Sequence, residues 1–181
     1  FYDYEDRFTD YGLLIGINMQ MRSNWGFELS SSYARTKDDG VLYHSYDMSL
    51  SSWFNTHPSY SASLWGSFSH TYNYSDEYLG YFGNFGGSIS YKISSVLKAG
   101  SNFGGWYEME DNAALRKATY NFRPFVNVTP INNLTFRLFS DITVDTETER
   151  LNSIFVGFLF SYNFAPKSTI YLALNENLER N

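Results

Sequence analysis

Hydrophobic and polar residues alternate with a period of two along most of the chain. In the clearest stretch, residues 154–164, the even positions hold Ile, Val, Phe, Phe, Tyr and Phe, whereas the odd positions mix Phe and Leu with Gly, Ser and Asn. Successive side chains of a β-strand point to opposite faces, so this period predicts a strand with one apolar and one mixed face. The turn at Ala165–Ser168 leads into a second alternating stretch, residues 169–175, which completes a hairpin.

Eight further segments show the same alternation and are separated by turn-forming stretches such as Asn55–Pro58 and Pro130–Asn133. They are residues 11–21, 25–34, 42–54, 60–73, 81–93, 97–109, 120–128 and 134–144. No segment indicates a helix, and the composition does not change along the chain. The sequence therefore predicts an all-β, antiparallel fold with ten visible strands in a single domain over residues 1–181.

Alternation alone fits two architectures, because a soluble β-sandwich or lipocalin-like barrel also carries apolar residues on one face of each strand. The polar face here is mostly Ser, Gly, Asn and Thr instead of Lys and Glu, which is typical of a confined lumen. Segments of about 9 to 13 residues also match a tilted crossing of a bilayer better than soluble strands of about five or six residues. These two features favour an antiparallel transmembrane β-barrel.

Aromatic residues make up 20% of the chain, which exceeds what a core of this size needs. Many of them lie near the ends of predicted strands, where a membrane barrel carries interfacial girdles. The predicted girdle residues are Tyr11, Trp25, Tyr33, Phe54, Tyr60, Tyr72, Tyr107, Tyr120, Tyr162 and Phe164.

The predicted connections alternate in length, because those after the odd-numbered strands are short and those after the even-numbered strands are longer and more acidic. Outer-membrane barrels have short periplasmic turns and longer external loops, so both ends of this chain are expected outside the cell. Closed bacterial barrels have an even number of strands and normally periplasmic termini, so we expect the ten strands to be part of a barrel of twelve or more. The chain is then a fragment of a longer protein.

Charge and composition exclude several other classes of protein. The formal net charge is −6 and no basic cluster is present, which argues against nucleic-acid binding. The chain has no cysteine, so it has neither a disulfide framework nor a thiolate metal site. No run approaches the roughly 18 to 20 apolar residues of a membrane helix. The expected surroundings are the bacterial outer membrane, its lipid and lipopolysaccharide, with other envelope proteins as further candidate partners.

The polar face carries charged residues that are candidates for lining the lumen. If Thr129 pairs with Thr135, then Asn127 faces Arg137 and Arg123 faces Asp141 across two neighbouring strands. Either these charges form an internal ion pair in a filled barrel, or they form a selectivity constriction in a pore. The candidates are Arg123, Arg137, Asp141, Lys92, Lys98, Glu28, Asp47 and Glu108.

Catalytic and metal chemistry have weaker support. His44 and His70 are candidate cross-strand neighbours on the apolar face near the external rim, but no third metal ligand accompanies them. An embedded hydrolase would need a His with an acidic or serine partner at the rim, and no Gly-x-Ser-x-Gly motif is present. We expect no enzyme activity, no catalytic residues, no metal and no cofactor.

The C-terminal stretches Phe125–Pro130, Ser161–Ser168 and Tyr171–Glu176 carry an aromatic strand, a Pro-x-Ser turn and an apolar strand that ends in Asn-Glu. This pattern resembles the C-terminal barrel domain of a family of large, Bacteroidota-like outer-membrane proteins, which also have an N-terminal carbohydrate-binding-like module. In that family a further strand follows the Asn-Glu loop, which agrees with the expected fragment. The resemblance implies no catalytic residues.

Together these observations predict an outer-membrane β-barrel that acts as a passive pore or transport channel. The alternative is a structural or anchoring barrel that displays a glycan-binding module or joins a surface assembly. A barrel-embedded hydrolase is the more distant alternative.

Overall fold

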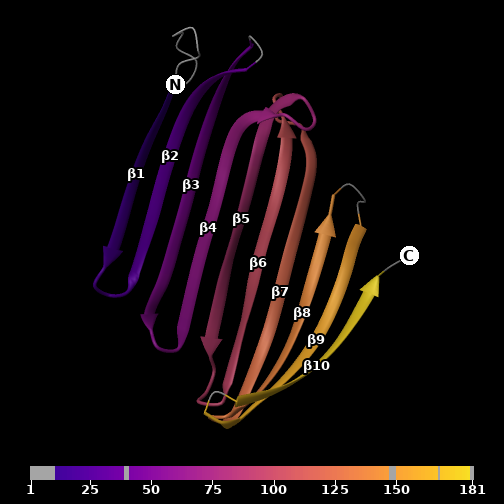
Figure 1. Ribbon diagram of the computed structural model, residues 1–181. Helices are drawn as coiled ribbons and strands as arrows, with labels where there is room; N and C mark the ends of the chain where they lie inside the picture. The colour runs from indigo at the N-terminus through magenta and orange to yellow at the C-terminus, as the bar shows by residue number, and fades with distance from the viewer. Residues whose placement is uncertain (1–10, 39–40, 147–149, 167, 180–181) are drawn as a thin grey trace.

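Ten β-strands form a single antiparallel sheet in the computed structural model, which describes residues 11–38, 41–146, 150–166 and 168–179 (Figure 1). The strands are β1 (Tyr11–Met21), β2 (Trp25–Asp38), β3 (Val41–His57), β4 (Tyr60–Asn73), β5 (Tyr78–Lys92), β6 (Leu97–Glu110), β7 (Leu115–Ile131), β8 (Leu134–Asp145), β9 (Arg150–Ala165) and β10 (Ser168–Glu179). Among the described residues, no helix is long and apolar enough to cross a membrane.

The sheet is a meander, in which each strand pairs with the strand that follows it in the sequence. This topology follows from the short connections, since a tight turn can join only antiparallel neighbours. The ladders are regular over long stretches; β1 and β2, for example, pair without interruption from Tyr11 opposite Arg35 to Met21 opposite Trp25. The prediction of ten antiparallel strands in an all-β fold is confirmed.

The sheet curves but does not close (Figure 1). β1 and β10 form its two edges, and within the described part of the chain neither edge pairs with a second strand. The prediction of a barrel is therefore confirmed only to the level of one curved antiparallel sheet. The sandwich alternative has no second sheet among the described residues to support it.

Several strands are longer than the alternation predicted. β3 and β7 have 17 residues each, because the ladder with their neighbours continues through polar positions that were read as turns. The prediction of a long connection after the second strand is wrong, because β2 ends at Asp38 and β3 begins at Val41. The connection at residues 93–96 is as long as those at 74–77 and 111–114. The difference in connection length between the two ends of the sheet is therefore smaller than predicted.

Most of the exposed aliphatic side chains lie on one face of the sheet, which we call the apolar face, and no other described residue covers them. On β1, for example, Leu13, Ile15 and Ile17 are 58%, 61% and 58% exposed. The same face exposes further residues from every other strand except β6, among them Leu29, Met48, Leu64, Ile89, Phe122, Leu138, Val156 and Leu172. Among the described residues, Ala118 is the one buried hydrophobic residue, so this single layer has no core of its own.

Aromatic rings cover glycines directly opposite them on neighbouring strands, and these contacts replace a core. On the polar face the pairs are Trp53 with Gly26, Trp65 with Gly86, Phe125 with Gly100, and Phe139 with Gly157. On the apolar face they are Tyr107 with Gly83, Phe103 with Gly87, and both Phe85 and Tyr120 with Gly105. Each ring occupies the space that a Cβ atom would need, which fixes the register of the two strands.

We expect Gly86→Val to destabilise the protein by about 1–3 kcal/mol, the usual range for overpacking. A Cβ at this position would lie 2.5 Å from Cζ2 of Trp65 and 3.0 Å from the carbonyl oxygen of Phe103. Urea unfolding followed by tryptophan fluorescence measures the effect. Gly16→Val is the matched control, because its Cβ would meet its nearest neighbour, the carbonyl oxygen of Leu29, at 3.6 Å. Equal losses in both variants would contradict this packing role.

Candidate functional site

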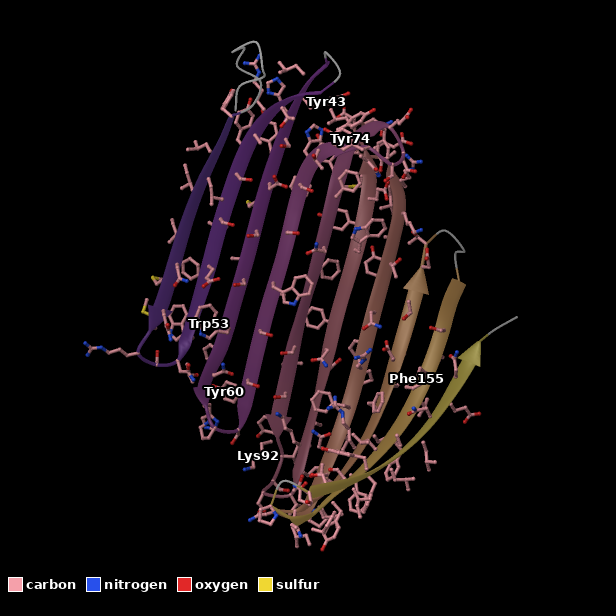
Figure 2. All side chains as sticks on the ribbon, viewed as in Figure 1. Tyr43, Trp53, Tyr60, Tyr74, Lys92 and Phe155 are labelled. Atoms are coloured by element: carbon pink, nitrogen blue, oxygen red, sulfur yellow. The ribbon has the colours of Figure 1, made fainter. Side chains whose placement is uncertain are left out.

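The eight charged residues predicted to line a lumen all lie on the face opposite the exposed apolar side chains. Residues directly opposite each other in a ladder share a face, so the strand pairing places these residues on one side of the sheet. Examples of such pairs are Glu28 opposite Ser51 and Glu108 opposite Lys117. Trp53, Lys92 and Phe155, which are labelled in Figure 2, belong to the same face. We call this surface the polar face.

Arg123 and Asp141 form an ion pair on the polar face between β7 and β8. The guanidinium donates to Oδ2 of Asp141 from Nε at 3.0 Å and also from Nη2. The other carboxylate oxygen accepts a hydrogen bond from the side-chain amide of Asn121, which also lies 3.4 Å from Oγ1 of Thr143. The side chain of Asp141 is 19% exposed and that of Arg123 is 46% exposed, so the pair sits at the surface of the sheet with the carboxylate the better covered of the two.

The register predicted for this hairpin is confirmed. Asn127 pairs with Arg137, and the hydroxyls of Thr129 and Thr135 lie 3.4 Å apart. Arg137, unlike Arg123, has no carboxylate partner among the described residues. Its guanidinium carbon lies 4.7 Å from the ring centroid of Phe125 and 5.7 Å from that of Phe139, so cation–π contacts hold it between two rings.

The remaining acidic candidates each have a neutral hydrogen-bonding partner. Glu28 accepts from the side-chain amide of Asn18, and Asp47 accepts from the hydroxyl of Ser32 at 3.2 Å. Glu108 is buried, with 7% of its surface exposed, and accepts from the hydroxyl of Tyr78. Lys92 and Lys98 face each other directly across β5 and β6.

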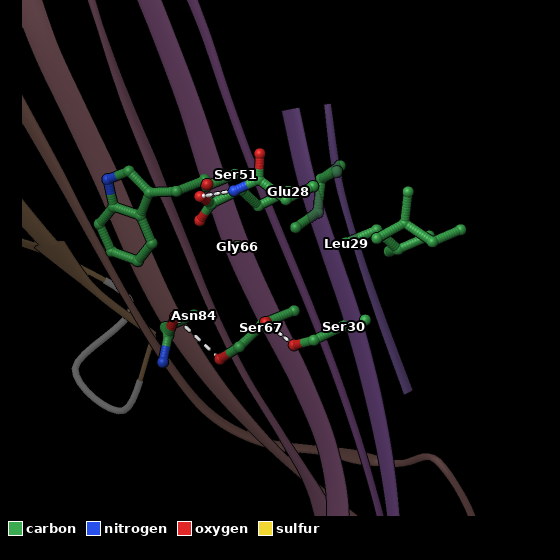
Figure 3. A pocket seen from close by; sticks show the side chains of 13 residues that line it. Glu28, Leu29, Ser30, Ser51, Gly66, Ser67 and Asn84 are labelled. Carbon is green, nitrogen blue, oxygen red and sulfur yellow. Dashed lines mark hydrogen bonds between the residues drawn. The ribbon is translucent and has the colours of Figure 1, made fainter. Parts of the chain in front are cut away.

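A hollow of about 700 Å³ opens on the polar face over β1 to β5 (Figure 3). Hydroxyl and amide side chains surround it, including Ser30 and Ser49, whose oxygens are 2.7 Å apart, and Ser67, which donates to Asn84 at 3.0 Å. Glu28 is the one charged residue among those that line the hollow, so the hollow carries little net charge.

The predicted girdle residues all lie on the apolar face. Tyr11 packs against Tyr33 with ring centroids 5.7 Å apart, and Phe54 stacks on Tyr60 at 5.7 Å. Tyr33, Tyr107 and Tyr120 lie several residues inside β2, β6 and β7, because these strands extend further than predicted. Whether they mark membrane interfaces stays a prediction.

The two histidines on the apolar face are diagonal cross-strand neighbours, because His44 lies two residues along β3 from the residue directly opposite His70. His70 pairs with Tyr46, and His44 pairs with Arg35. Nδ1 of His44 lies 2.6 Å from the hydroxyl of Tyr33. The described residues contain no group of three or more potential metal ligands.

His70 contacts an acidic residue, as the hydrolase alternative required. Its Nε2 lies 2.9 Å from Oδ1 of Asp111 in the connection between β6 and β7, and its ring packs on Tyr81 at 4.4 Å. Within the described ranges, no serine or threonine hydroxyl bonds to this imidazole. The pair therefore ties a connection to β4 but has no nucleophile beside it.

Sequence reasoning missed the groups that complete the charged cluster. These groups are Asn121, which donates to Asp141, and the rings of Phe125 and Phe139, which contact Arg137. The signal was present: Phe125 and Phe139 have the same parity as Arg123 and Arg137, and the predicted register places them opposite each other.

Comparisons with known protein families, curated proteins and solved structures each gave no significant match to this chain. The residues and their geometry therefore carry the functional argument.

We expect Arg123 and Asp141 to show a coupling free energy of about 0.5–1 kcal/mol, the range for exposed ion pairs, in a double-mutant cycle with alanine. Asp141→Ala alone should destabilise more than Arg123→Ala, because it removes the acceptor of two side chains. Urea unfolding of the four proteins measures both quantities. Arg22→Ala, in the turn after β1, should show no coupling to Asp141→Ala. Additive effects of Arg123→Ala and Asp141→Ala would contradict the pair.

Proposed function

We propose that this chain is the β-barrel region, or a substantial part of it, of a bacterial outer-membrane protein that acts as a passive pore or transport channel. The observation that carries the proposal is the uncovered apolar face of a sheet with no core. An apolar surface with exposed large side chains from nine of the ten strands far exceeds the few hundred Å² that a soluble monomer normally exposes. Lipid is a solvent in which such a face is stable.

The hydrogen-bonding needs of the backbone are also consistent with a lipid environment. In hydrocarbon every N–H and C=O group must be paired, which a β-sheet achieves only if its edges are closed. The free edges at β1 and β10 would then pair, directly or through further strands, with the polar face inward. Arg123, Arg137 and Asp141 would line the resulting lumen and act on passing ions.

A structural or anchoring barrel is the second candidate, and the polar face gives it specific support. Trp53, Trp65, Phe125 and Phe139 lie over glycines on this face, and Arg123 is neutralised by Asp141. Large rings and a closed ion pair are what a filled barrel needs. The C-terminal resemblance to barrels that carry a carbohydrate-binding-like module also fits a protein that displays another domain.

An arginine on the apolar face should prevent insertion into lipid, whereas one on the polar face should not. Ile15 and Leu14 are adjacent on β1, face opposite sides of the sheet and are 61% and 72% exposed. We expect Ile15→Arg to lower the yield of protein folded into phosphatidylcholine vesicles strongly, since arginine near mid-bilayer costs about 2–4 kcal/mol. Leu14→Arg should insert like the original protein. Equal insertion of both variants would count against a lipid-facing apolar face.

A pore should conduct ions, and its selectivity should depend on Arg137. Planar-bilayer recordings under a KCl gradient should show discrete conductance steps, and Arg137→Ala should shift the reversal potential toward cation preference because one fixed positive charge is lost. Arg22→Ala, at a turn, is the charge-matched control and should leave the reversal potential unchanged. Insertion without conductance would favour the anchoring barrel.

A further inference from the structure

One row of the polar face carries only cations and an amide. Lys92 on β5 pairs with Lys98 on β6, Lys98 pairs with Asn127 on β7, and Asn127 pairs with Arg137 on β8. These four residues therefore lie side by side across four neighbouring strands. We call them the basic row.

No carboxylate balances the basic row. Within the part of the chain that the structure describes, Lys92, Lys98 and Arg137 form no ion pair, whereas nearby Arg123 does. The polar-face residues two positions away along the four strands are also uncharged on the side toward the middle of the sheet, namely Ser90, Gly100, Phe125 and Phe139. Like charges directly opposite each other destabilise a sheet, so the facing lysines need a counter-charge.

The row already has features of an anion site. Arg137 makes cation–π contacts with the rings of Phe125 and Phe139, which restrain the guanidinium without using its N–H donors on a carboxylate. Oδ1 of Asn127, between Lys98 and Arg137, is buried and has no hydrogen-bond partner. The side-chain NH₂ group of the same residue adds a neutral hydrogen-bond donor to the row.

A hollow of about 150 Å³ adjoins the two lysines. Asn55, His57, Ser61 and Ser90 are among the other residues that line it, and the hydroxyls of Ser61 and Ser90 lie 2.8 Å apart. Lys92, labelled in Figure 2, is the last residue of β5, so the hollow lies where the polar face meets one end of the sheet. The two ammonium groups and the two hydroxyls line one space, which matches an oxyanion, and Asn127 and Arg137 continue the row beyond this hollow.

From this juxtaposition we infer that the basic row binds a phosphate group of an anionic solute. Three cations in a line favour a multivalent oxyanion over a single carboxylate. The inference deepens the proposed function and rests on it, because it names the class of solute that a pore would admit from this end. The location on the polar face favours a free solute over the phosphate of a lipid head group.

Calorimetric titration of the full chain, folded in zwitterionic micelles, with inorganic pyrophosphate tests the row. We expect saturable binding that weakens with added NaCl, and a loss of about tenfold in affinity for Lys98→Gln, equivalent to about 1.4 kcal/mol. Lys98→Gln should unfold at an equal or higher urea concentration, because it relieves the facing charges. Arg22→Gln, a cation at the same end of the sheet but off the row, should bind like the original protein.

Three outcomes overturn the inference. In the first, pyrophosphate does not bind saturably. In the second, Lys98→Gln and Arg22→Gln bind pyrophosphate with equal affinity. In the third, the protein binds vesicles that contain phosphatidic acid but does not bind pyrophosphate. The last result would assign the row to lipid. Pyrophosphate binding without conductance in bilayers would instead leave the basic row standing and refute the pore, so the two proposals fail separately.

Discussion

Each strand of this sheet pairs its backbone with its sequence neighbours, two for β2 to β9 and one for the edge strands β1 and β10, and its side chains alternate between the apolar and the polar face. Backbone pairing holds the ten strands in one layer, and the period-two alternation sorts the side chains across that layer. No second layer covers the apolar face among the described residues, so the stability of the fold depends on the medium that contacts Ile15, Leu64 or Leu172. The fold therefore cannot be explained without the medium that surrounds it.

Without a core, side-chain packing takes place within each face. Aromatic rings pack over glycines on the neighbouring strand, as Trp65 does over Gly86 and Tyr107 over Gly83. The missing glycine side chain leaves the space that the ring fills. A shift of one residue would move each ring to the other face of the sheet, away from the glycine that it now covers. These pairs therefore specify register in a sheet where serine-rich ladders, such as Ser61 with Ser90, do so only weakly.

Charges on the polar face are arranged in two ways. Acidic groups are satisfied individually: Asp141 by Arg123 and Asn121, Glu108 by Tyr78, and Asp47 by Ser32. The basic row is not, since Lys92 faces Lys98 and Arg137 contacts two aromatic rings but no carboxylate among the described residues. In the proposed pore, the unpaired cations of the basic row would act on solutes. In a filled barrel they would have no such role.

Alternation in the sequence by itself determined the ten strands, their antiparallel order and the face on which each charge lies, because these depend only on parity within a strand and on short turns. It also set Asn127 opposite Arg137, since a tight turn joins the two strands. The partnership of His70 with Asp111, the burial of Glu108 and the rings beside Arg137 were decided by tertiary structure. Such contacts depend on ladder lengths and rotamers, which the period of two leaves free.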